Sequence, residues 1–130
     1  MSLSRRQARR QALVLLYQWD LTGQEFGVLY DGEIDAFSLG LAEAVREQSP
    51  LLDSRITAAA EGWTADRLGT LERNVLRIAI LELETGVVPP EIAINEAVVL
   101  AKRYASETAG RLVNGILGRI SRELKARQGQ

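Results

Sequence analysis

The sequence predicts an all-α fold, a single compact bundle of six to seven helices. Apolar residues recur at the spacing of a helical face along most of the 130 residues, and the alternation that marks a strand is nowhere sustained. The three prolines stand only at positions 50, 89 and 90, so long stretches lack residues that interrupt helices. A chain of this length is expected to form one domain, residues 1–130, whose core needs no disulfide.

A first helix is predicted over residues 4–21, with two distinct faces. At about 100° per residue, four apolar side chains fall within roughly 60° of one another and should face the core: Ala8, Ala12, Leu15 and Trp19. Four basic side chains gather on an adjoining arc of roughly 140°, onto which Leu13 and Tyr17 also project: Arg5, Arg6, Arg9 and Arg10. One helix should therefore carry a core face and a cationic face.

The next part of the chain is predicted to be a loop followed by two helices. Glycines at positions 23, 27 and 32 mark residues 22–33 as the loop. Helices are expected over 34–48 and 51–62, with Ser49 and Pro50 between them.

A central helix is predicted over residues 71–85, because this segment is apolar nearly all round, as in a helix that others surround. The preceding residues, 63–70, are interpreted as either a turn or a short helix. Gly86 suits the end of the central helix, and Pro89 and Pro90 require an extended entry into the next one.

The last third of the chain is predicted to hold two further helices. The first is amphipathic through Ile94, Ala97, Val98, Ala101 and Ala105. In the second, Asn114 and Gly115 resemble the turn of a hairpin. Helix is nevertheless favoured, because six apolar residues close onto one arc of roughly 140° at helical spacing: Leu112, Val113, Ile116, Leu117, Ile120 and Leu124. Gly115 and Gly118 lie away from that arc, where another backbone or a ligand could approach.

The composition excludes several classes of function. Cysteine and histidine are both absent, so thiolate metal sites, disulfides and histidine-based catalysis are ruled out. Any chemistry would have to rest on carboxylates, lysine or hydroxyl groups alone, and we expect no cofactor and no metal. No apolar run approaches the roughly 18 residues of a membrane span, which favours a soluble cytoplasmic protein with no membrane partner.

Charge is sorted along the chain although the net charge is only −1. Residues 1–20 hold four arginines and one aspartate, and residues 100–130 hold seven basic and two acidic side chains. Residues 21–99, in contrast, hold five basic and fourteen acidic side chains. If the two basic ends share a face, that face should favour a polyanion, nucleic acid first.

Several ordered motifs resemble the NusB family. The first is Arg9–Arg10 through Ala12–Leu13 to Leu16–Tyr17–Gln18–Trp19–Asp20. It is followed by Leu71–Glu72–Arg73–Asn74–Val75–Leu76–Arg77–Ile78–Ala79, Ala93–Ile94–Asn95–Glu96–Ala97–Val98, Leu100–Ala101–Lys102 and Val113–Asn114–Gly115–Ile116–Leu117. The resemblance covers most of the chain and is weakest between residues 22 and 66.

The resemblance implies an all-helical transcription antitermination factor without enzyme activity. Such a protein binds boxA-type single-stranded RNA in leader transcripts, notably of ribosomal RNA operons, together with the small-subunit ribosomal protein NusE, as part of an RNA polymerase antitermination complex. It implies RNA contacts at Arg5, Arg6, Arg9, Arg10 and Tyr17, and in a second region at Lys102, Arg103, Tyr104, Ser106 and Glu107. It implies NusE contacts at Glu72 and Arg73.

The physical chemistry of the residues agrees with this implication. Single-stranded RNA needs cations for its phosphates and flat groups for its bases, which arginine and tyrosine supply. We therefore expect residues 5–10 and 102–111 to meet as one cationic surface.

The residues alone leave other interpretations open. The arginines could be a solvated surface, Tyr17 and Tyr104 could be core or rim aromatics, and Glu72 and Arg73 could be exposed helix charges. A homodimer that buries the basic face is a second functional hypothesis. A third is the RNA-binding module of an RNA methyltransferase, although 130 residues leave no room for the second domain.

The chain departs from the family pattern in the turn after residue 104. Where the family usually has glycine, an acidic pair with serine, and phenylalanine, this chain has Ala105, Glu107 with Thr108, Ala109 and Leu112. Alanine adopts a left-handed conformation less freely than glycine, so the helix is expected to end differently here.

Overall fold

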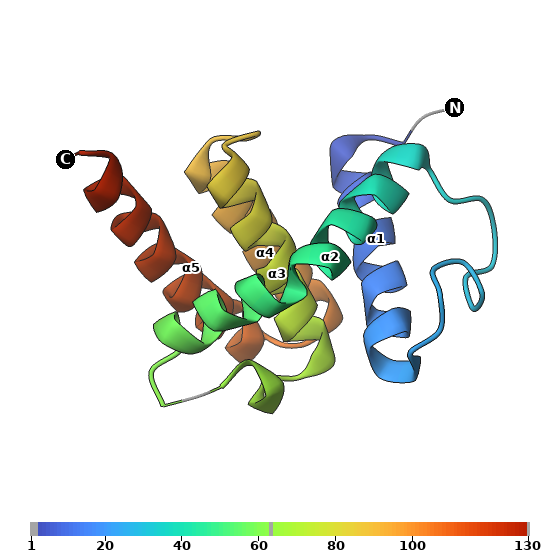
Figure 1. Ribbon diagram of the computed structural model, residues 1–130, viewed down its shortest axis with the longest axis horizontal. Coiled ribbons are helices and arrows are strands. Elements are labelled where there is room, and N and C mark those ends of the chain that lie inside the picture. The colour runs from blue at the N-terminus through green and yellow to red at the C-terminus, as the bar shows by residue number, and fades with distance from the viewer. Residues whose placement is uncertain (1–2, 63, 130) are drawn as a thin grey trace.

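The computed structural model describes residues 3–62 and 64–129, and the regular secondary structure within them is helical. Its elements are α1 (Arg5–Thr22), α2 (Ala36–Ala59), the short 3₁₀ helix η1 (Ala65–Arg67), α3 (Thr70–Thr85), α4 (Pro90–Tyr104) and α5 (Glu107–Gln128) (Figure 1). The predicted all-α fold is confirmed. The expected count of six to seven helices is slightly higher than the five α-helices of the described residues, because two predicted helices are one.

That single helix is α2, so the predicted separation of residues 34–48 from 51–62 is wrong. Pro50 lies inside α2 and lacks the N–H that would bond to the carbonyl of Arg46. The hydroxyl of Ser49 donates to this carbonyl instead, at 2.6 Å. The acceptor that proline leaves without a partner is thus satisfied locally, and the helix continues.

α1 begins and ends with caps that the sequence encodes. The Ser4 hydroxyl accepts from the backbone N–H of Gln7 at 3.1 Å, and the Gln7 side chain accepts from the N–H of Ser4 at 2.9 Å. This reciprocal pair satisfies two N–H groups that a helix start leaves unbonded. Gly23 ends the helix at a φ of 75°, a left-handed conformation that glycine adopts at little cost. The predicted boundaries, 4–21, are correct to within one residue.

α3 is the central helix, as predicted. It packs against α1, α2, α4 and α5, and Figure 1 shows it between α5 and α1, with α2 crossing the molecule from one to the other. Leu76 and Ile80 are completely buried. The shared core also draws on the other four α-helices, through Leu13, Leu16, Val45, Leu52, Ile56, Ala97, Leu100, Val113 and Leu117.

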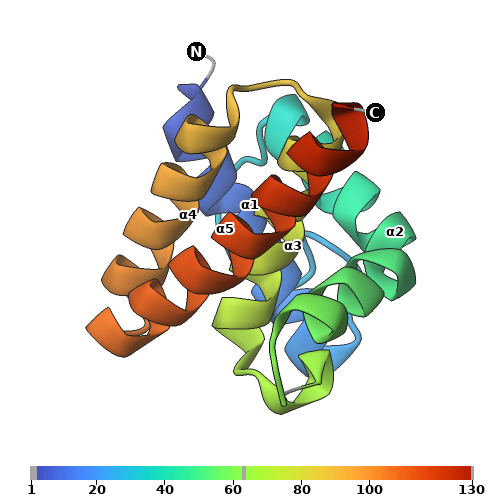
Figure 2. The same ribbon diagram turned by 90° about the vertical axis from the view of Figure 1, so that its left-hand side faces the viewer.

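α4 and α5 lie side by side and are joined by the short turn at residues 105–106 (Figure 2). Asn114 and Gly115 lie inside α5, so the predicted helix is confirmed over the hairpin. The outer face of α5 is not covered by another helix in this view. The arrangement places the start of α1, the end of α4 and the start of α5 at the surface, where the basic residues of both chain ends lie.

Candidate nucleic-acid interface

The four arginines of α1 lie in different environments, and Arg9 is buried. Its Nε donates to both carboxylate oxygens of Glu82 on α3, at 3.1 and 3.0 Å, and an Nη nitrogen lies 2.9 Å from the same group. Each side chain is only 6% exposed. Burial raises the pKa of Glu82, and the charge of Arg9 opposes that rise. The expectation of four arginines on one exposed face is therefore wrong for Arg9, whose charge is neutralised inside the protein.

Arg6 and Arg5 remain at the surface but have protein partners. The Nε of Arg6 donates to both oxygens of Glu96 on α4, at 3.1 and 3.2 Å, while 66% of the Arg6 side chain stays exposed. The Arg5 guanidinium lies 3.8 Å from the ring centre of Phe37 on α2. Arg6 therefore joins α1 to α4 with part of its guanidinium open to solvent, whereas Arg5 points toward α2.

Arg10 and Tyr104 line one surface hollow of about 360 Å³, which we call the α1–α4 hollow. Tyr104, at the end of α4, is 40% exposed, and the Arg103 guanidinium lies 5.5 Å from its ring centre. One residue of each segment expected to meet, Arg10 of 5–10 and Tyr104 of 102–111, thus lies at this hollow, whereas Arg6 and Arg111 line other hollows. The lining residues are Leu3, Gln7, Arg10, Gln11, Val14, Tyr30 and Tyr104.

Gln11 fixes one wall of the α1–α4 hollow, a role that sequence reasoning missed. Its side-chain amide donates to the Tyr30 hydroxyl at 2.9 Å and to the carbonyl of Glu33 at 3.0 Å. Its carbonyl oxygen accepts from the backbone N–H of Asp35 at 2.9 Å. One buried amide therefore ties the loop before α2 to α1 and holds the Tyr30 ring beside Arg10.

The other side chains predicted beside the arginines are less exposed than the projection suggests. Leu13 is buried in the core and Tyr17 is half-buried. Trp19, expected in the core, is also half-buried and meets Phe26 edge-on, with ring centres 6.2 Å apart. The stacking surface of this face is therefore provided mainly by Tyr104.

The turn between α4 and α5 combines capping with exposed charge. The Ser106 hydroxyl accepts from the N–H of Ala109 at 3.0 Å and caps α5. Lys102 and Glu107 are exposed and form a loose ion pair at 3.7 Å. Ala105 has a φ of −123°, so α4 ends without a left-handed residue, as expected where alanine replaces the family's glycine.

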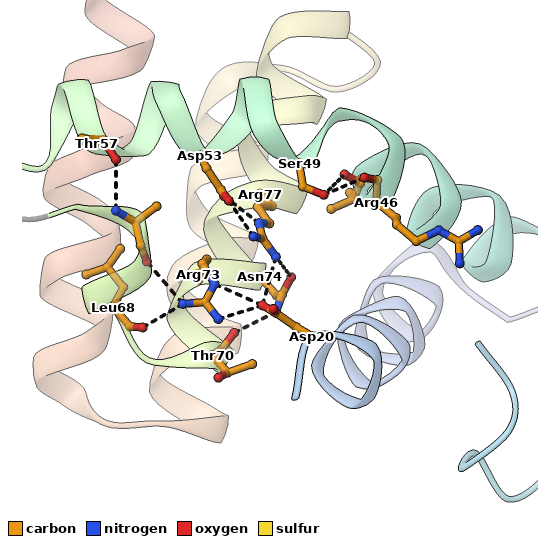
Figure 3. Close-up of polar contacts among 12 residues, drawn as sticks. Asp20, Arg46, Ser49, Asp53, Thr57, Leu68, Thr70, Arg73, Asn74 and Arg77 are labelled. Carbon is orange, nitrogen blue, oxygen red and sulfur yellow. Dashed lines mark hydrogen bonds and ion pairs between the residues drawn. The ribbon is translucent and has the colours of Figure 1, made fainter. Parts of the chain in front are cut away.

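A second polar cluster joins the end of α1 to α3 and α2 (Figure 3). One carboxylate oxygen of Asp20 accepts from Arg73, Asn74 and Arg77, at distances between 2.9 and 3.1 Å. Burial would raise the pKa of Asp20, but these hydrogen bonds and positive charges hold it below its usual value. The Nε and Nη2 of Arg77 also donate to the two carboxylate oxygens of Asp53 on α2, at 2.8 and 2.7 Å.

Glu72 and Arg73 are the residues that the resemblance implies as NusE contacts. Their charged groups differ in how accessible they are to a partner. The Arg73 side chain is only 14% exposed, and it also donates to the carbonyls of Ala65 and Leu68 at 3.3 and 3.1 Å. Glu72 lies half-buried in the first turn of α3, with its carboxylate over Gly69, where any Cβ would clash with it. Glu72 can therefore present its carboxylate to a partner more readily than Arg73 can its guanidinium.

Sequence reasoning missed Asp20, Asn74, Arg77 and Glu82 as partners in these clusters. A signal was present, because Asn74, Arg77 and Glu82 interrupt an otherwise apolar helix and are buried. A buried charge requires a paired group, so each such residue implied a partner elsewhere in the chain. The identity of that partner depends on helix packing, which the sequence pattern does not give.

The fold and this surface define a small all-helical protein with arginines and an exposed tyrosine at the junction of α1 and α4. A sequence profile of the NusB family matches residues 6–122. The chain belongs to the NusB family.

Individual relatives are similar to this chain along nearly their whole length. The transcription antitermination protein NusB of Dictyoglomus thermophilum is 43% identical over 126 residues, which span 94% of this chain and 87% of that protein. The solved structure of T. maritima NusB matches with a TM-score of 0.82 at 32% identity, covering 95% of this chain and 94% of that one. A chain in the crystal structure of antitermination factors NusB and NusE in complex with dsRNA matches with a TM-score of 0.78 at 33% identity, covering 92% and 96%.

Proposed function

We propose that this chain is a transcription antitermination factor that binds boxA-type single-stranded RNA together with NusE, within an RNA polymerase antitermination complex on ribosomal RNA leader transcripts. The observation that carries the proposal is the α1–α4 hollow, where Arg10 of the first basic segment and Tyr104 of the second lie together. A cation beside an exposed ring matches the phosphate and the base of one nucleotide.

We assign direct RNA contact to four side chains at or near this hollow: Arg6, Arg103 and Tyr104, which are exposed, and Arg10, which is half-buried. The proposed flanking contacts lie in or near the same two segments: Arg5, Tyr17, Lys102 and Glu107. Arg9 and Ser106 act as positioning residues, because one is paired inside the core and the other caps α5. Of the residues that the resemblance implies as RNA contacts, these two hold the helices in place and do not themselves contact the RNA.

We assign the NusE-binding surface to the start of α3. Glu72 would contact the partner, and Arg73 would hold the start of α3 against the end of α1 through Asp20. The support for NusE as the partner is the complex of a relative with NusE and dsRNA. Two proteins bound to one RNA raise each other's effective concentration, so affinity should be higher with NusE than without it.

The proposal includes the setting of the protein. Residues 1–130 would act as one RNA-binding domain, in the cytoplasm where transcription takes place, and without catalysis. The five α-helices share one core, which supports a single domain. Within residues 3–62 and 64–129, none of the helices is both long and apolar enough to cross a membrane.

Fluorescence anisotropy with labelled boxA RNA, measured with and without NusE, tests the proposal. Arg10→Ala and Tyr104→Ala should each weaken binding, with the loss of a stacked ring costing about 1–3 kcal/mol. Arg55→Ala, which removes a charge that pairs with Glu84 on another face, is the matched control and should bind normally. Equal affinity for boxA RNA and a scrambled RNA, with or without NusE, would overturn the proposal.

A further inference from the structure

The outer face of α5 carries a row of basic residues beyond the α1–α4 hollow. Arg111, Arg122 and Lys125 project onto one side of the helix, and the first two lie about 16 Å apart along its axis. All three are exposed, and Figure 2 shows α5 with no other helix in front of it. We call these three residues the α5 ridge.

The charge of the α5 ridge is not balanced by carboxylates. Arg119, on the α2 side of the same helix, pairs with Glu61 and Glu123. Across residues 3–62 and 64–129, however, the three ridge residues form no ion pair. The Arg111 guanidinium donates instead to the neutral hydroxyl of Thr108, at 3.3 Å. The ridge is therefore a surface of positive potential on a protein whose net charge is −1.

A hollow of about 460 Å³ runs beside the ridge, between α5 and the end of α2. Its walls include Arg111, Arg119 and Arg122, with Gly115 between them, and Glu61, which pairs with Arg119 and leaves Arg111 and Arg122 as the cations outside that pair. A Cβ at Gly115 would meet nothing within 4 Å, so this stretch of helix surface is open to an approaching chain. Arginines around an open, shallow floor suit the sugar–phosphate backbone of a nucleic acid, since guanidinium groups bind phosphate oxygens bidentately.

We propose that the α5 ridge binds the backbone of the RNA that flanks boxA. The inference rests on the proposed function, because the ridge begins one helical turn after the α4–α5 turn that leads away from Arg103 and Tyr104. A strand leaving the α1–α4 hollow past this turn would meet Arg111 first and Arg122 next. The contacts are to phosphates, so they extend the footprint without adding base preference.

The test compares two RNAs on the same protein, in the presence of NusE. One RNA contains boxA alone, and the other adds about a dozen nucleotides of unstructured flanking sequence, within the length that single-strand binding surfaces cover. For wild type, the longer RNA should bind more tightly at low salt. Arg111→Gln combined with Arg122→Gln should lose about tenfold in affinity for the longer RNA and leave the short RNA within twofold. The salt slope for the longer RNA should fall by about 1.4, or roughly 0.7 for each lost phosphate.

Two further double variants serve as controls. Arg111→Lys with Arg122→Lys keeps both charges and should retain most of the salt slope, whereas Arg46→Gln with Arg55→Gln removes the same charge from α2 and should change neither RNA affinity. Helicity and thermal unfolding of the ridge variant should match wild type, because the replaced side chains are exposed and form no ion pair within the described ranges.

The outcomes separate this inference from the proposed function. If wild type binds both RNAs equally, or the ridge variant weakens both equally, the ridge does not hold flanking RNA, although boxA binding stands. If wild type fails to distinguish boxA from a scrambled sequence, the proposed function itself is wrong. A ridge that affects a protein partner and neither RNA would also overturn the inference.

Discussion

Arg9 and Glu82 form a bidentate ion pair across the interface of α1 and α3, 73 residues apart in the chain and almost entirely buried. Two charges that leave water together are tolerated because each satisfies the other, and removing one leaves the other unpaired at high cost. The pair joins α1, which bears the arginines proposed to contact RNA, to the central helix of the core.

Arg9→Ala should lower the free energy of unfolding by about 3–5 kcal/mol, because Glu82 then stays buried without a counter-charge. Urea unfolding measures this change. Arg9→Met combined with Glu82→Leu should cost much less than the sum of the single changes, since no charge remains buried. A stable Arg9→Ala protein that fails to bind boxA RNA would show instead that Arg9 contacts RNA directly.

Asp20→Asn should destabilise the protein at neutral pH, and the difference from wild type should shrink in acid. The pKa of Asp20 is lowered below its usual 3.8 by Arg73, Arg77 and Asn74, against the effect of burial. Its stabilising contribution is therefore complete above pH 3.8 and is lost as the pH falls through the lower pKa of the folded state. Unfolding curves across this range give the measurement. Asp31→Asn, in an exposed loop, is the control, and a parallel loss in both variants would contradict the assignment.

Ser49→Ala should cost about 1–3 kcal/mol, because the Arg46 carbonyl then has neither a proline N–H nor the hydroxyl as a donor. In a Pro50→Ala background the backbone N–H returns, and the same Ser49→Ala change should cost much less. A double-mutant cycle of unfolding free energies measures this coupling. Additive effects would mean that Ser49 does not compensate for the proline.

Glu72→Ala and Arg73→Ala should separate partner binding from stability. The Glu72 change should weaken association with NusE and leave the melting temperature nearly unchanged. The Arg73 change should weaken association and also lower the melting temperature, because it removes the links to Asp20 and to the carbonyls of Ala65 and Leu68. Calorimetric titration and thermal unfolding provide the two measurements. If Glu72→Ala binds NusE with normal affinity, the assignment of the NusE-binding surface to the start of α3 is wrong.

The helices could be predicted from sequence wherever apolar spacing and local caps determine them. Residues 4–21 and the central helix followed from periodicity, and Gly86 correctly marked the end of α3. Pro50 misled the prediction because proline usually interrupts a helix, and the compensating hydroxyl of Ser49 only becomes visible in three dimensions.

The candidate site was less predictable, because exposure depends on partners that are distant in sequence. A helical projection gives the direction of Arg9, yet its burial depends on Glu82 in another helix. The meeting of Arg10 and Tyr104 was expected only in outline, from the sorting of charge toward the two ends. Tyr30, which Gln11 holds in the same hollow, lies on a loop that carries no periodic signal.

The attachment of α1 at both ends has a thermodynamic consequence. Arg9 anchors the helix near its start and Asp20 near its finish, so the surface between them is preorganised before a ligand arrives. The protein therefore loses its conformational freedom during folding rather than during association. On the proposed function, the ordering that accompanies binding should therefore fall mainly on the RNA strand rather than on this surface.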